Sequence, residues 1–155
     1  MNADIETLKM GIKHLPPMAR KRAERALGIA TPETEHKVFV YGTLLSNECN
    51  CHRAPRARRQ NAWTLGTLHD TGYGFPAIVL KGTTRIVGEV LTVDDDAFRS
   101  MDRLEGYPSF YRRERRHIHL VGGGSVLAWV YVMNRLPEGA KIIESGDWRK
   151  YRRGE

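Results

Sequence analysis

The chain is poor in cysteine and contains no long apolar run. Its two cysteines, Cys49 and Cys51, are separated by one residue and cannot link distant parts of a fold, which argues against a small disulfide-stabilised secreted protein. No run approaches the roughly 18 apolar residues that a membrane-spanning helix needs. Residues 1–4 do not begin a secretory signal. We therefore predict a cytoplasmic protein with no membrane partner.

The cysteine pair is interpreted as two reduced thiols. Cys49, Cys51 and His52 are residue types that bind metals, but no second Cys or His cluster follows at zinc-finger spacing. A metal site is the less favoured alternative, because this ligand set is incomplete.

The 155 residues suit one folded domain, and their charge is strongly positive. A chain of this length buries roughly two thirds of the surface that its unfolded form exposes. It has 25 Lys and Arg against 18 Asp and Glu, a net charge of +7. That charge favours anionic partners such as phosphates, carboxylates or nucleic acid, and does not choose among them.

Residues 1–35 are predicted to form a helical extension that precedes a barrel domain, residues 36–155. Apolar residues at helical spacing predict a first helix over residues 4–15, which Pro16 and Pro17 end. Pro17 also suits the first turn of a second helix, and Gly28 is placed to end it.

From Lys37 onward, short β-type runs alternate with turns, and a Gly-rich turn over residues 122–125 predicts a hairpin. The predicted strands cover residues 38–41, 62–68, 77–80, 85–93, 111–121 and 126–133. Only one helix is indicated among them. We predict the α+β class: a small mixed, mostly antiparallel β-barrel with one helix, plus the helical extension.

The most informative stretch is Val38 to Leu45. Alternation places Val38 and Val40 on one face of a strand and two aromatic residues on the other, so both faces are apolar, as in a central strand. Gly42 then lets the chain turn and approach a ligand, because it has no Cβ. The main-chain N–H groups of this turn are predicted to be free at the mouth of a binding loop.

The predicted helix carries a carboxylate on its apolar side. Asp94 is its predicted N-cap, and Gly106 and Pro108 end it. Glu105 continues the apolar stripe in the last turn, although Glu is rarely buried without a partner. Burial and the negative end of the helix dipole both raise the pKa of such a carboxyl, which suits a general acid/base near neutral pH.

A second interpretation of Glu105 stays open. Its side chain turns to solvent, or it pairs with an arginine near the end of the helix. Arg112 and Arg113 follow on the next strand, where alternation puts them on opposite faces, so at most one of them faces Glu105.

Four short motifs occur in order between about Lys37 and Tyr151: Tyr41-Gly42-Thr43-Leu44, Leu104-Glu105-Gly106-Tyr107-Pro108 followed by Tyr111-Arg112, Ala128-Trp129-Val130-Tyr131, and Ser145-Gly146-Asp147-Trp148. Their order and spacing resemble the γ-glutamylcyclotransferase-like family, which includes the γ-glutamylamine cyclotransferases. The resemblance implies a small mixed barrel with a substrate loop after its first strand and a glutamate as acid/base catalyst.

Enzymes of this family cyclise a γ-glutamyl group to 5-oxoproline and release the attached amine. The resemblance therefore implies a small γ-glutamyl substrate and no cofactor or metal. Glu105 matches the catalytic glutamate, and the substrate loop matches Tyr41, Gly42, Thr43 and Leu44. Tyr111 and Tyr131 are further candidates for substrate binding because each offers a hydroxyl from an apolar strand, although most buried tyrosines only pack.

The connection over residues 46–59 departs from the expected family pattern, since it is more basic and contains both cysteines. An arginine here could bind a substrate carboxylate, but we interpret each of its arginines as solvent-exposed. The leaving amine and the oligomeric state are not indicated by the sequence.

Two other functions stay open. The first is a basic module that binds RNA or DNA, which is less favoured because no nucleic-acid motif and few aromatic residues accompany the charge. Its candidate residues are Arg53, Arg56, Arg58, Arg59, Arg112, Arg113, Arg115, Arg116, Arg149, Lys150, Arg152 and Arg153. The second is a γ-glutamyl sensor that keeps the pocket without turnover.

Overall fold

The computed structural model describes residue 7, residues 10–28 and residues 34–155, and the chain divides into two units, Met1–Glu33 and Thr34–Glu155. The first unit contains α2 (Pro17–Ala26), which has a proline in its first turn and is followed by Gly28 at a φ of 65°, as predicted. The helix predicted over residues 4–15 lies partly outside the described residues. Within that range, residues 10–12 are helical.

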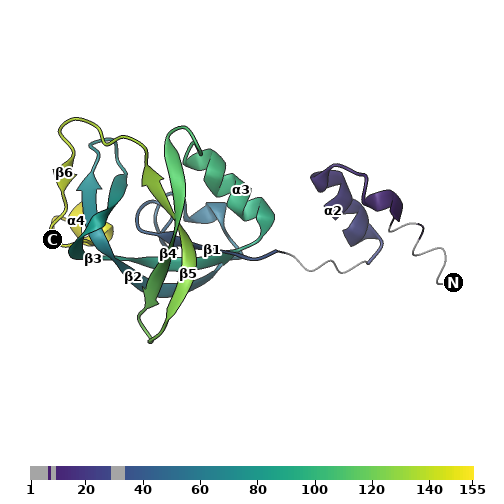
Figure 1. Cartoon of the computed structure of the whole chain (residues 1–155), viewed down its shortest axis with the longest axis horizontal. Coiled ribbons are helices and arrows are strands. Elements are labelled where there is room, and N and C mark those ends of the chain that lie inside the picture. Colours follow the sequence, from purple (N-terminus) through teal and green to yellow (C-terminus); the bar gives the residue numbers. More distant parts are fainter. Residues whose placement is uncertain (1–6, 8–9, 29–33) are drawn as a thin grey trace. The chain divides into compact units, whose positions relative to one another are not determined.

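The second unit is built on a sheet that closes into a barrel (Figure 1). The strands are β1 (His36–Val40), β2 (Arg58–Asp70), β3 (Pro76–Val93), β4 (Tyr111–Leu120), β5 (Ser125–Met133) and β6 (Lys141–Ile142). Their order is β3-β1-β5-β4-β2-β6, and a β3–β2 pairing closes the ring. The β1–β5 pair is parallel, whereas β1–β3, β2–β3, β2–β4 and β4–β5 are antiparallel. The predicted mixed, mostly antiparallel barrel of the α+β class is confirmed.

Strand β3 corrects the predicted boundaries, because it joins two expected strands, residues 77–80 and 85–93, into one. Its register against β2 shifts at one point: Gly66 pairs with Thr84, and Thr67 pairs with Val79. The intervening residues form a bulge in which Gly82 has a φ of 127°, a value that favours glycine. The residues between the two expected strands, Gly82 among them, therefore lie within a continuous strand.

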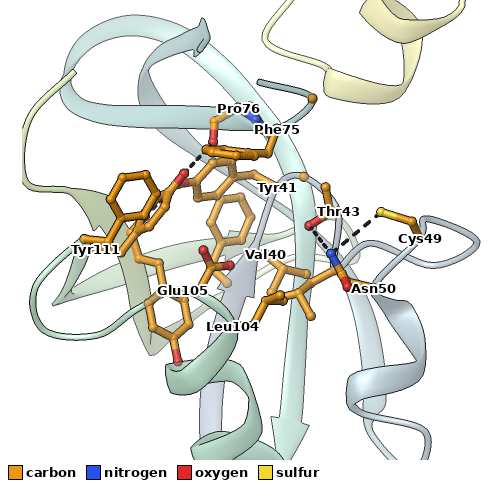
Figure 2. A pocket seen from close by; sticks show the side chains of 16 residues that line it. Val40, Tyr41, Thr43, Cys49, Asn50, Phe75, Pro76, Leu104, Glu105 and Tyr111 are labelled. Carbon is orange, nitrogen blue, oxygen red and sulfur yellow. Dashed lines mark hydrogen bonds between the residues drawn. The ribbon is translucent and has the colours of Figure 1, made fainter. Parts of the chain in front are cut away.

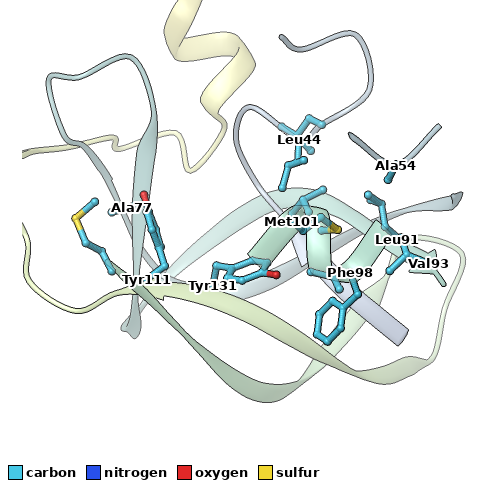
Figure 3. Packing of buried hydrophobic residues seen from close by; sticks show 13 residues of the cluster. Leu44, Ala54, Ala77, Leu91, Val93, Phe98, Met101, Tyr111 and Tyr131 are labelled. Atoms are coloured by element: carbon cyan, nitrogen blue, oxygen red, sulfur yellow. The ribbon is translucent and has the colours of Figure 1, made fainter. Parts of the chain in front are cut away.

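The central strand β1 separates two hydrophobic clusters, as its alternation predicts. Phe39 belongs to a cluster with residues from each of the other barrel strands, such as Val90 and Val130, and this cluster fills the barrel. Trp148, at the start of α4 (Trp148–Arg152), is also buried there. The second cluster lies on the outer face and contains Val38. Figure 3 shows other members of this cluster, among them Leu91 and Met101.

Helix α3 (Asp95–Leu104) covers that outer cluster along one side of the barrel (Figures 1 and 3). The Asp94 carboxylate caps it by accepting a hydrogen bond from the Ala97 N–H at 2.8 Å, as predicted. Phe98 and Met101 are buried against the barrel, and each contributes roughly 1.5–3 kcal/mol by leaving water. Glu105 is the C-cap residue, one position beyond the predicted last turn.

Candidate active site

A cavity of about 300 Å³ opens where β1 ends, beside the C-terminal end of α3 (Figure 2). Its lining includes all the residues singled out from the sequence: Tyr41, Gly42, Thr43, Leu44, Glu105, Tyr111 and Tyr131. These residues come from the end of β1, the α3 cap and strands β4 and β5, so the closure of the barrel brings distant parts of the sequence together.

The Glu105 carboxylate points into this cavity, toward the loop that bears Thr43 (Figure 2). Its main chain is fixed, because its N–H donates to the Met101 carbonyl at 3.0 Å and its carbonyl accepts from the Tyr111 N–H at 3.2 Å. Burial raises the pKa of Glu105 to about 7. Both the carboxylate and the carboxylic acid are therefore populated near neutral pH.

Within the described part of the chain, the Glu105 carboxylate has no hydrogen bond or ion pair. The two arginines that follow are directed elsewhere. Arg113 pairs with Asp102 at 3.4 Å and lies over the Trp129 ring, and Arg112 pairs with Glu114 at 3.6 Å. Pairing of Glu105 with an arginine, one of the alternatives raised by the sequence, does not occur among these residues.

Hydrogen bonds within the loop after β1 stabilise its conformation, and its carbonyl groups are the acceptors. The Leu45 N–H donates to the Gly42 carbonyl at 3.1 Å, and the Asn50 N–H donates to the Thr43 carbonyl at 2.9 Å. The Asn50 side-chain amide also donates to the Thr43 hydroxyl at 3.1 Å. The N–H groups of Gly42, Thr43 and Leu44, three residues that line the cavity, donate to no acceptor among the described residues.

Gly42 is required for packing as well as for the turn. A Cβ at this position would lie 2.7 Å from both Cγ and Cδ of Pro76, a cavity-lining residue at the start of β3. The sequence suggested that Gly42 permits the approach of a ligand, and the structure adds that it permits the approach of Pro76.

The three tyrosines form walls of the cavity, and their hydroxyl protons are already used. Tyr41 donates to the Tyr131 carbonyl at 2.7 Å, Tyr111 to the Pro76 carbonyl at 3.1 Å, and Tyr131 to the Asp102 carboxylate at 2.6 Å. Burial raises the pKa of each hydroxyl, and the nearby Glu105 charge raises it further. These side chains are therefore neutral at physiological pH.

Several lining residues were not found from the sequence. They are Phe39, Val40, Cys49, Asn50, Gly74, Phe75, Pro76, Leu104 and Phe110. Cys49 and Asn50 come from the basic loop, whose composition gave no sign of this position. Within the described ranges, no group of three His, Cys, Asp or Glu residues could hold a metal ion, and no helix is long and apolar enough to cross a membrane.

Two arginines of the basic loop region, Arg53 and Arg59, are half-buried, so the prediction that they are solvent-exposed is wrong. The Arg59 guanidinium donates to the buried Glu89 carboxylate at 3.1 Å and to the Leu44 carbonyl at 3.0 Å. Glu89 also accepts from the N–H of Ser46 at 2.7 Å and from its hydroxyl at 2.6 Å. This carboxylate on β3 therefore fastens the loop that follows β1.

Many of the basic residues considered for nucleic-acid binding are engaged with acidic ones. Ion pairs join Arg58 to Glu35, Arg59 and Arg149 to Glu89, Arg112 to Glu114, Arg113 to Asp102, and Arg153 to Glu155. The geometry thus offers no observation that favours a nucleic-acid interface over the cavity.

Comparison with known proteins gives a consistent result. The family model for gamma-glutamyl cyclotransferase, AIG2-like proteins matches residues 38–150. A protein of Methanocaldococcus jannaschii, named provisionally as a gamma-glutamylcyclotransferase, is 43% identical over 121 residues, which are 74% of this chain and 97% of that protein. The gamma-L-glutamyl-butirosin B gamma-glutamyl cyclotransferase of Niallia circulans is 33% identical over 74% of this chain and 76% of its own.

A solved structure shows the same fold. The crystal structure of YkqA from Bacillus subtilis superimposes with a TM-score of 0.64 at 26% sequence identity. The match covers 79% of this chain and 44% of the YkqA chain, so the present chain spans less than half of that protein.

Proposed function

Since this chain belongs to the gamma-glutamyl cyclotransferase, AIG2-like family, we propose that it cyclises the γ-glutamyl group of a small substrate to 5-oxoproline and releases an amine or amino acid. Glu105 is the general acid/base in this proposal. The observation that carries it is a carboxyl with a raised pKa and no partner among the described residues. It shares a cavity with a loop whose Gly42, Thr43 and Leu44 N–H groups have no acceptor there.

Proton transfer is well matched to this carboxyl. The substrate α-ammonium, with a pKa of about 7.7–8.0, must lose a proton before its nitrogen can attack the γ-carbonyl carbon. Glu105, whose pKa burial raises to about 7, accepts that proton at little energetic cost. It returns the proton to the departing nitrogen when the original amide bond breaks, so the reaction consumes no water.

The loop after β1 supplies the second element of the proposal. Attack by the α-amine builds negative charge on the γ-carbonyl oxygen. Gly42, Thr43 and Leu44 line the cavity, and their N–H groups have no acceptor among the described residues. Preorganised donors of this kind stabilise an oxyanion in a site with little water. The nucleophile and the carbonyl belong to one molecule, so the enzyme has to select the folded conformer of the substrate.

Tyr41, Tyr111 and Tyr131 bind substrate in this proposal through their rings and hydroxyl oxygens, because their hydroxyl protons are held by the protein. They limit the volume available to the glutamyl unit and partly shield the Glu105 carboxyl from water. The proposal uses no metal or cofactor.

The test is the substitution Glu105→Gln, with Glu114→Gln as matched control. Glu114 is a half-exposed residue of β4 that does not line the cavity. We expect Glu105→Gln to keep the fold, measured by circular dichroism, and to lose at least about a hundredfold in 5-oxoproline release from γ-glutamyl peptides and γ-glutamyl-lysine. Glu114→Gln should retain wild-type turnover. Full activity of Glu105→Gln would refute its role, and binding without turnover by the wild-type protein would favour a sensor.

A further inference from the structure

A second cavity, of about 1000 Å³, adjoins the Glu105 cavity. It is lined by Tyr73, Phe75, Ser109, Phe110, Met133, Asn134, Arg135, Leu136, Pro137 and Glu138. Phe75 and Phe110 line both cavities, so these two rings form the boundary between them. We call this second cavity the outer groove.

The boundary continues as a row of aromatic rings from the Glu105 cavity to solvent. Ring centroids are 5.4 Å apart for Tyr111 and Phe110, 6.2 Å for Phe110 and Phe75, and 6.3 Å for Phe75 and Tyr73. Tyr73 is 71% exposed and Phe110 is 50% exposed. Large aromatic side chains that remain exposed beside a cavity are typical of a ligand-binding groove.

The position of the outer groove relates it to the leaving group. The Glu105 cavity, at about 300 Å³, is at the small end of ligand sites and suits the glutamyl unit. The substituent on the γ-amide nitrogen has to extend away from that unit. Past Phe75 and Phe110, it enters the outer groove.

The chemistry of the outer groove indicates what the substituent is. Its charged lining residues within the described chain are Arg135 and Glu138. Because their charges have opposite signs, they do not favour a charged substituent. Its aromatic walls favour a ring, because an edge-to-face or offset ring contact contributes about 0.5–1.5 kcal/mol beyond the area that it buries.

We propose that the substrate is the γ-glutamyl amide of an amine that carries a neutral aromatic ring, and that this ring lies in the outer groove against Tyr73, Phe75 and Phe110. The inference rests on the proposed cyclisation. In that reaction the α-nitrogen bonds to the γ-carbonyl carbon, the bond to the arylalkyl nitrogen breaks, and the amine leaves with the proton that the α-ammonium lost. No oxidant, reductant or water is needed.

The experiment compares γ-glutamyl-phenethylamide with γ-glutamyl-ethylamide, which has the same amide and no ring, by 5-oxoproline release. We expect kcat/KM of the wild-type protein to be at least about tenfold higher for the phenethylamide. Tyr73→Ala should abolish most of this preference and leave the ethylamide rate unchanged. Tyr73→Phe should restore the preference, because it keeps the ring.

Leu127→Ala is the control for loss of an exposed apolar side chain, because Leu127 is 42% exposed and lines neither cavity. It should leave both rates unchanged. Equal kcat/KM for the two amides, unaffected by Tyr73→Ala, would overturn the groove proposal while the proposed cyclisation stands.

Failure of both amides to release 5-oxoproline would count against the proposed cyclisation, and the groove is then tested by binding alone. The probe is N-acetyl-phenethylamine, a neutral mimic of the leaving portion, titrated against the full chain by NMR. Saturable shifts that Tyr73→Ala weakens and Tyr73→Phe retains would support an aryl-binding groove. No saturable binding would overturn it.

Discussion

Replacing Glu89 by alanine should destabilise the barrel far more than replacing a solvent-exposed glutamate by alanine. Glu89 is buried in β3, and its carboxylate accepts hydrogen bonds from Ser46 and Arg59. Arg149, from α4, lies within 3.4 Å of the same carboxylate. Glu89→Ala would leave two arginines and the Ser46 N–H around an apolar gap.

The expected magnitude follows from burial. Removing one partner of a buried ion pair costs about 3–5 kcal/mol, because the remaining charge stays desolvated. The Arg59 and Arg149 side chains are 20% and 34% exposed and keep part of their hydration, so we expect Glu89→Ala to cost about 3 kcal/mol, the lower end of this range, by chemical denaturation, with a Tm decrease of order 10 °C. Since Ser46 and Arg59 hold the loop after β1, we also expect kcat for 5-oxoproline release to fall in conditions where the variant is folded.

The chain provides a matched control in Glu35→Ala. Glu35 pairs with Arg58 at 3.0 Å, but its side chain is 61% exposed and that of Arg58 is 71% exposed. Exposed pairs contribute about 0–1 kcal/mol, so this variant should be close to wild type. A loss from Glu89→Ala no larger than that from Glu35→Ala would refute the reasoning.

The pH dependence gives a second check on Glu89. Burial opposes its ionisation, but the hydrogen bonds from Ser46 and the charges of Arg59 and Arg149 outweigh burial and lower its pKa below the usual value. A lowered pKa stabilises the folded state above the unfolded pKa of about 4.3, and this stabilisation is lost as pH falls through the folded pKa. The difference in unfolding free energy between wild type and Glu89→Ala should therefore shrink below about pH 4.

Three further predictions concern the cavity. Because burial raises the pKa of Glu105 to about 7, kcat/KM should rise with pH along a limb centred near 7; a limb near 4.5 would contradict the proposed desolvation. Ionising this buried carboxyl costs folding free energy as pH rises from about 4.3 to 7, so Glu105→Gln should gain stability relative to wild type over that range. Gly42→Ala should lower kcat/KM at least about tenfold, because its Cβ would meet Pro76 at 2.7 Å, whereas Gly122→Ala, with nothing within 4 Å, should match wild type in the same assay.

Short sequence patterns predicted the parts of the fold that are determined by interactions between neighbouring residues. The N-cap of α3 at Asp94 and the hairpin turn depend on neighbouring residues. Both are present, with the turn at residues 121–124, one residue before its predicted position. The continuity of β3 depends instead on its partner, since β2 pairs with it on both sides of the bulge. The short elements β6 and α4 have too few residues for a periodic pattern, so sequence periodicity could not reveal them.

The same distinction applies to the cavity. Residues on β1 and at the end of α3 could be proposed from the sequence, because a regular element fixes where its side chains point. Asn50 and Cys49 reach the cavity through the fold of the loop after β1. That fold depends on Arg59 and on Glu89, which lies 43 residues after Ser46 and 30 residues after Arg59 in the chain. No pattern within the loop itself contains this information.

A raised pKa for Glu105 is unexpected in a chain with a net charge of +7, because any nearby cation would lower it. The arrangement around Asp102 explains how it is maintained. Asp102 lies on α3, pairs with Arg113 and accepts a hydrogen bond from the Tyr131 hydroxyl. The Arg113 guanidinium also lies over the rings of Phe98, Tyr107 and Trp129. Asp102 thus engages Arg113, and the Glu105 carboxylate has no ion pair among the described residues, so burial alone sets the direction of its pKa shift.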